Sequence, residues 1–126
     1  MHKNLLFLVC FVLLAAACGS GAIENPTSKE ILENNPDADI FVYDGIVFSN
    51  ASDLPYYQLD HSEKGNVLGE IKETTDKSKR FKDFTSTVLP IGTPLYSTTE
   101  EQTDSHFTII ATVDEVDILY IALLEG

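Results

Sequence analysis

The hydrophobic pattern begins with one long apolar run, Leu5–Ala17, that stands apart from the rest of the chain. At 13 residues it is shorter than the roughly 20 that a helix needs to cross a hydrocarbon core. Lys3 precedes the run and small residues end it, which is the charged, apolar and small-residue order of a secretory signal. We therefore expect residues 1–17 to be removed from the mature protein.

Small and polar residues follow this run, and a short helical pattern comes after them. The stretch from Gly19 to Lys29 contains glycine, serine and proline, which is typical of a tether. Thr27 and Glu30 have the spacing of a capping box, which predicts a helix over "SKEILEN" that stops before Pro36. We expect residues 18–38 to be a tether with one short helix.

Two runs of β-branched and aromatic residues, Ile40–Tyr43 and Ile46–Asn50, come next, with Asp44 and Gly45 between them. Asp-Gly between such runs is a strong hairpin signal, because both central residues of a type I′ turn have positive φ. A polar stretch rich in turn-forming residues follows and predicts an irregular segment.

The middle of the chain carries weaker strand patterns. Alternation in "NVLGEIKET" places Val67 and Ile71 on the same side of an expected strand. A charged loop follows, and short strands are expected around 87–89 and 94–97, where prolines confine them to sheet edges or strand starts.

Two strongly apolar runs, "SHFTIIATV" and "DILYIALLEG", end the chain on either side of an acidic turn at Asp114 and Glu115. They predict the central hairpin of a sheet, and the second is apolar on both faces, as for a strand covered on each side. We expect an α+β fold that is mostly β, with a small antiparallel sheet or partly open barrel of about six or seven strands and one or two short helices. Residues 39–126 would form this single β-rich domain.

Charge limits the choice of partners. The chain has a formal charge of −12, and loss of Lys3 with residues 1–17 leaves 7 basic against 20 acidic residues, or −13. This balance argues against nucleic acid and against lying flat on anionic lipid, whereas it suits a cationic partner. An acidic surface also keeps an exported protein soluble, so charge alone does not decide between these roles.

Cys18 comes directly after the small residues, and the other cysteine, Cys10, lies in the segment expected to be removed. The sequence "LAAAC" resembles a bacterial lipoprotein signal, although Ala15 stands where such signals usually have leucine. The resemblance implies that Cys18 receives a diacylglyceryl group and becomes the first residue after cleavage. Plain secretion after a cut at Ala17 and an uncleaved anchor are the alternatives.

The phrases "IFVYDGIVF", "VLGEIKET", "LPIGTPLYS" and "LYIALLEG" resemble the small, uncharacterised lipoproteins of Bacillus-type Gram-positive bacteria. This resemblance covers most of 39–126 and implies a β-rich domain without a known active site. Lantibiotic-immunity lipoproteins have the same size and anchoring, which makes capture of a cationic peptide conceivable. Fold alone does not transfer function.

No motif predicts catalysis. His61 in "LDHSE" and His106 in "TDSHF" each have serine and aspartate nearby, but catalytic triads are assembled from residues distant in sequence. The carboxylates at 37–39 and 114–117 lack the twelve-residue loop of an EF-hand calcium site, and we interpret them as solvated turn acids. We expect no enzyme, no metal and no cofactor.

Two groups of residues are candidates for binding. Tyr56 and Tyr57 follow Pro55 in a turn-rich segment and offer contact area for a ligand; the alternative is a core plug under a long loop. A basic cluster in an otherwise acidic protein would contact anionic wall polymer or lipid headgroups, or be a solvated loop. The cluster consists of Lys77, Lys79, Arg80 and Lys82.

The sequence thus predicts a lipoprotein held on the outer face of the cell membrane, with a monomer favoured. Its expected function is a non-catalytic binding module for an envelope component or cationic peptide. The alternative is a structural or accessory lipoprotein that docks to another membrane protein through a sheet edge or the final hairpin.

Overall fold

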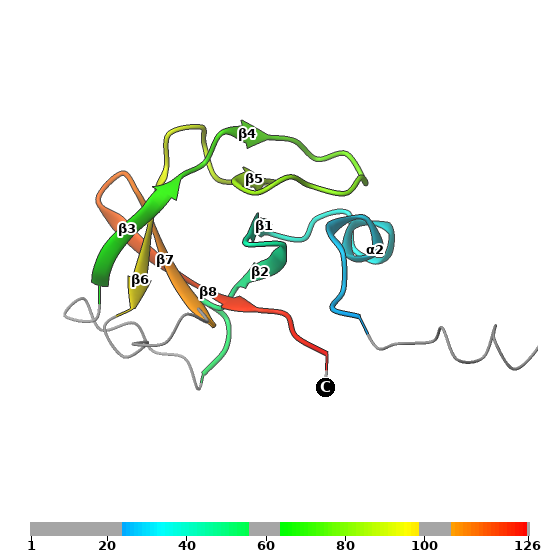
Figure 1. Ribbon diagram of the computed structural model, residues 1–126, viewed down its shortest axis with the longest axis horizontal. Helices are drawn as coiled ribbons and strands as arrows, with labels where there is room; N and C mark the ends of the chain where they lie inside the picture. Colours follow the sequence, from blue (N-terminus) through cyan, green and yellow to red (C-terminus); the bar gives the residue numbers. More distant parts are fainter. Residues whose placement is uncertain (1–23, 56–63, 99–106, 126) are drawn as a thin grey trace, which may run out of the picture.

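A computed structural model describes residues 24–55, 64–98 and 107–125, which form one curled sheet with a helix against its outer side (Figure 1). Helix α2 spans Ser28–Asn34. The strands are β1 (Ile40–Tyr43), β2 (Ile46–Asn50), β3 (Lys64–Glu70), β4 (Glu73–Thr74), β5 (Thr85–Ser86), β6 (Pro94–Thr98), β7 (Thr108–Val113) and β8 (Val116–Ala122). Their order is β3-β6-β7-β8-β2-β1-β5-β4, and β4 with β5 is the parallel pair.

The mostly β fold is confirmed, but the described residues form eight strands rather than six or seven. The strand expected over 66–74 is divided into β3 and β4. Ile71 donates its N–H to the carbonyl of Thr93 at 2.9 Å, whereas Lys72 donates to the carbonyl of Phe84 at 2.8 Å. One short segment therefore supplies both outer strands of the sheet.

Strand β3 differs from the expected alternation. Val67 is 63% exposed whereas Ile71 is fully buried, so the two do not share a side. Register shifts against β6 lie on both sides of Val67, and Leu68 packs against the core instead. Gly69 lies at this irregularity, where an added Cβ would come within 2.5 Å of the Phe84 ring, so the close approach requires glycine.

Helix α2 matches the expected "SKEILEN". Thr27 is its N-cap, and its side-chain oxygen accepts a hydrogen bond from the N–H of Glu30 at 3.2 Å. Leu32 is fully buried against the outer face of the β1–β2 hairpin, beside Ile40, Val42 and Val47. Within the ranges that the structure describes, no helix has the length and apolar character to cross a membrane.

The β1–β2 hairpin also matches, and its turn residues Asp44 and Gly45 have φ of 52° and 73°. The strand expected at 87–89 is wrong. The side-chain oxygen of Ser86 accepts hydrogen bonds from the N–H groups of Val88 and Leu89, so a side chain takes the amides that a partner strand would use. The expected strand at 94–97 is confirmed as β6.

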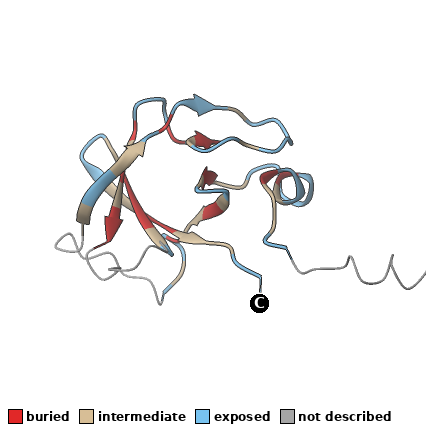
Figure 2. Ribbon diagram, in the orientation of Figure 1, coloured by how far each residue is buried: buried red, intermediate tan, exposed pale blue. Residues whose placement is uncertain are grey.

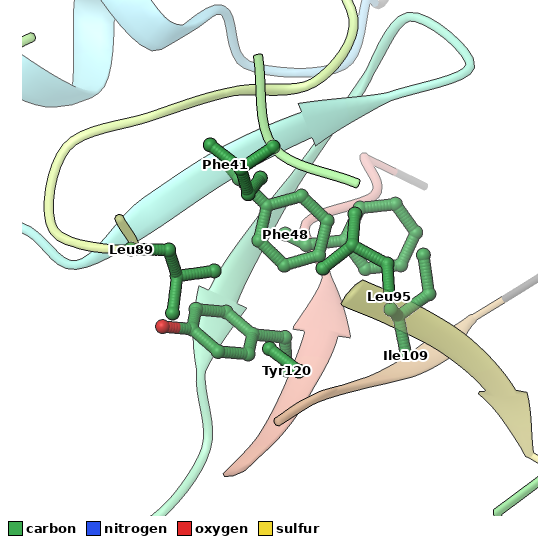
Figure 3. Packing of buried hydrophobic residues seen from close by; sticks show 8 residues of the cluster. Phe41, Phe48, Leu89, Leu95, Ile109 and Tyr120 are labelled. Carbon is green, nitrogen blue, oxygen red and sulfur yellow. The ribbon is translucent and has the colours of Figure 1, made fainter. Parts of the chain in front are cut away.

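The core lies on the concave side of the sheet. The rings of Phe41 and Phe48 stack with their centroids 5.3 Å apart, and the ring centroids of Phe41 and Tyr120 are 4.8 Å apart. Figure 3 shows these rings from β1, β2 and β8 converging with Leu95 and Ile109. Leu119 of β8 packs on the opposite face, so this strand is covered on both sides, as its sequence predicts.

Candidate functional site

A polar hollow of about 400 Å³ lies where the chain leaving α2 meets the end of β2. It is lined by Asn35, Asp37, Ala38, Asp39, Ser49, Asn50, Ser52 and Asp53. Three aspartates and several polar side chains gather there, and we call it the acidic hollow. It is a candidate site for a cation or a cationic group.

Two asparagine turns shape the hollow. The side-chain oxygen of Asn35, at the end of α2, accepts a hydrogen bond from the N–H of Asp37 at 3.3 Å. Asn50, at the end of β2, accepts from the N–H of Ser52 in the same way at 2.7 Å. Both are local turns in which an amide side chain takes the place of a backbone carbonyl. They fix the backbone on the two sides of the hollow.

Asp39 holds the inner part of the hollow together. Tyr120 donates its hydroxyl to Oδ1 of Asp39 at 2.8 Å, and Asn50 donates its side-chain amide to Oδ2 at 2.8 Å. Burial raises the pKa of Tyr120 well above its ordinary value, and the neighbouring charge of Asp39 raises it further. Tyr120 therefore stays a proton donor, and both oxygens of Asp39 are engaged within the protein.

Asp37 and Asp53 differ from Asp39 because both are exposed. Among the described residues, no hydrogen bond or ion pair engages either carboxylate. Across residues 24–55, 64–98 and 107–125, no group of three or more histidine, cysteine, aspartate or glutamate side chains is arranged to hold a metal ion. Asp37 and Asp53 thus leave negative charge, which no described residue engages, on the rim of the hollow.

The hollow itself was missed in the sequence. The sequence predicts Asp37 and Asp39 only as solvated turn acids and does not group Asp53 with them. For Asp39 this prediction is wrong, because the residue is half-buried and both of its carboxylate oxygens accept hydrogen bonds within the protein. The β1–β2 register pairs Ile40 with Ser49, so residues before β1 must lie beside residues after β2. The Asp-Gly hairpin signal thus contained the information needed to find the hollow.

The four basic residues lie together in the loop between β4 and β5, which is exposed along most of its length (Figure 2). We call residues 77–82 the basic loop. Lys79 is not free, because its Nζ lies 3.2 Å from Oε1 of Glu73. Among the described residues, no ion pair engages Lys77, Arg80 or Lys82.

The remaining candidates, Cys18, Tyr56, Tyr57, His61 and His106, lie outside the described residues. Comparisons with protein-family models, with curated proteins and with solved structures found no match for this chain. We therefore infer function from the acidic hollow, the basic loop and the amino-terminal sequence.

Proposed function

We propose that this protein is a lipoprotein, anchored by lipid on Cys18 to the outer face of the cell membrane, whose domain binds a cationic peptide or another cationic envelope component without catalysis. The observation that carries the binding role is the pair of exposed carboxylates, Asp37 and Asp53, which lie on the rim of the acidic hollow and which no described residue engages. The apolar run and "LAAAC" support the anchor.

The hollow offers a cationic side chain a charged contact that the backbone holds in place. Asp37 and Asp53 supply negative charge, and backbone turns at Asn35 and Asn50 hold that charge in place. A volume of about 400 Å³ is at the low end of ligand sites and suits one or two peptide side chains. The charge of the whole mature chain adds long-range attraction, which speeds encounter and weakens as salt is added.

The binding role is tested with a fluorescent lysine-rich peptide and the purified full-length lipoprotein in detergent. We expect Asp37→Asn with Asp53→Asn to weaken binding by about 0.5–2 kcal/mol, because each exposed carboxylate contributes up to about 1 kcal/mol. Fluorescence anisotropy at two salt concentrations measures the affinity, and binding should fall as salt rises.

The matched control is Asp114→Asn with Glu115→Gln in the β7–β8 turn, which removes the same charge away from the hollow. It should keep near wild-type affinity. Equal losses in the two double variants would mean that the peptide responds to net charge only, and the hollow would then not be its site.

The anchor is tested separately by intact mass of the protein extracted from its native membrane. We expect the mass of residues 18–126 plus acyl chains, and an unprocessed or released product for Cys18→Ala. Recovery of unmodified protein from the medium would contradict the lipoprotein assignment.

A second candidate function is docking to a membrane protein through a sheet edge, as Val67 on edge strand β3 is 63% exposed. The edges are poorly suited to adding a strand, because β3 is interrupted by register shifts and β4 has two residues. Co-purification of a stoichiometric membrane protein from detergent extracts would favour this function.

A further inference from the structure

The basic loop is fastened to the beginning of the folded domain. Ser28, the first residue of α2, is buried, and its hydroxyl donates to the carbonyl of Lys79 at 2.7 Å. The same oxygen accepts a hydrogen bond from the N–H of Phe81 at 2.8 Å. These contacts span more than fifty positions of sequence and place the loop beside the residues at which the described chain starts.

A small pocket of about 130 Å³ confirms this placement. Its lining includes Asn25, Pro26 and Thr27 from the start of the chain together with Arg80 and Phe81 from the basic loop. Asn25 also accepts a hydrogen bond from the N–H of Glu125 at 3.0 Å. Residues 25–27, which we call the amino-terminal strap, therefore lie against the domain beside Arg80.

Covalent geometry limits how far the start of the described chain can lie from a lipid on Cys18. Glu24 lies six positions after Cys18, and a chain of that length reaches at most about 20 Å. An anchor on Cys18 thus keeps Asn25, and with it the neighbouring Arg80, within reach of the bilayer surface.

From this placement we propose that the basic loop rests on anionic phospholipid headgroups of the membrane that holds Cys18, and so sets the orientation of the domain. The proposal rests on the lipid anchor of the proposed function. Lys77, Arg80 and Lys82 supply the contacts, since Lys79 is paired with Glu73. Arg80 matches the bidentate geometry of a phosphate, and lysines add point charge.

Charge around the loop is consistent with this partner. Residues 72–83 carry five basic and three acidic side chains, so the segment is net positive in a chain that is strongly acidic. The acidic hollow begins beyond the other end of α2, at Asn35 and Asp37. Anionic lipid attracts the first region and repels the second, which leaves the hollow facing away from the bilayer.

The test uses the full-length acylated protein, reconstituted in vesicles of phosphatidylcholine alone or mixed with phosphatidylglycerol, with a nitroxide quencher on a minority of headgroups. A fluorophore is attached at Ser78→Cys in the exposed basic loop or, in a second sample, at Ser52→Cys beside the hollow. We expect quenching at position 78 in phosphatidylglycerol vesicles, little in phosphatidylcholine, and little at position 52 in either. Added salt should reverse the quenching.

Two double variants complete the test. Arg80→Gln with Lys82→Gln should weaken the contact by about 25-fold, as about five-fold is expected for each basic residue at an anionic surface. Asn66→Asp with Val116→Glu changes the net charge equally at exposed positions elsewhere and should leave quenching unchanged.

Equal quenching at positions 78 and 52, equal quenching in the two lipids, or quenching that survives Arg80→Gln with Lys82→Gln would each overturn the proposal. Flotation of the vesicles separates this failure from failure of the anchor. A protein that does not float with phosphatidylcholine vesicles lacks the anchor, whereas one that floats without quenching at position 78 has the anchor but not the contact.

Discussion

At the scale of single residues, Tyr120 connects the core to the candidate site. Its ring is fully buried and packs against Phe41 (Figure 3). Its hydroxyl donates a hydrogen bond to Asp39, which lines the acidic hollow. A phenylalanine would fill the same space without the hydroxyl. The packing and the hydrogen bond are therefore separable by one substitution.

We expect Tyr120→Phe to lower the free energy of unfolding near neutral pH by about 1.5–3 kcal/mol, because a charged acceptor loses its donor. The pKa of Tyr120 is raised from its ordinary value of 10.0, so its contribution is fully present below that pH. Above pH 10.0 the Tyr120 hydroxyl loses its proton in the unfolded chain but keeps it in the folded protein. The free energy of unfolding of the wild type therefore falls by up to about 1.4 kcal/mol per pH unit. Tyr120→Phe has no hydroxyl to ionise, so its free energy of unfolding does not fall for this reason.

Urea unfolding of wild type and Tyr120→Phe across neutral and alkaline pH checks this prediction. The gap between the two proteins should be constant up to about pH 9 and narrow above about pH 10. A gap that keeps its full size at high pH would show that the hydroxyl is not held in its protonated form.

At the scale of elements, the helices and strands that depend on contacts between residues close in sequence are the ones that the sequence predicts correctly. Helix α2 and the β1–β2 hairpin were predicted with their correct bounds, since the Thr27 cap and the Asp44-Gly45 turn act over a few residues. The division between β3 and β4 was not predicted, because it depends on partners at Thr93 and Phe84, which are remote in sequence.

The contact between α2 and the basic loop also joins residues that are remote in sequence, and it depends on the side chain of Ser28. We expect Ser28→Ala to lower the free energy of unfolding by about 1–3 kcal/mol, because the carbonyl of Lys79 and the N–H of Phe81 lose their partner. Hydrogen exchange at the Phe81 amide should become faster. Urea unfolding and exchange measured by NMR report the two effects.

Ser78→Ala is the matched control, as it removes a hydroxyl from an exposed serine in the same loop. Its effect should stay within about 0.5 kcal/mol. Similar losses for Ser28→Ala and Ser78→Ala would contradict a specific role for Ser28 in holding the loop.

At the scale of the whole molecule, the net charge was known from the sequence but its distribution was not. The acidic hollow is assembled by the β1–β2 register, and the basic loop is brought to the start of the domain by Ser28. Both arrangements arise from folding, so a count of charges does not reveal them. The sequence names the basic residues, and the structure shows which of them is already paired.

Strand β8 stands inside the sheet, between β7 and β2, although it is the last strand along the chain. A polypeptide threaded through an export channel with its amino terminus leading would emerge with two partial sheets and without the strand that joins them. Assembly would then wait until residues 116–122 had crossed. The position of this one strand thus favours a chain that remains unfolded during transit and folds on arrival.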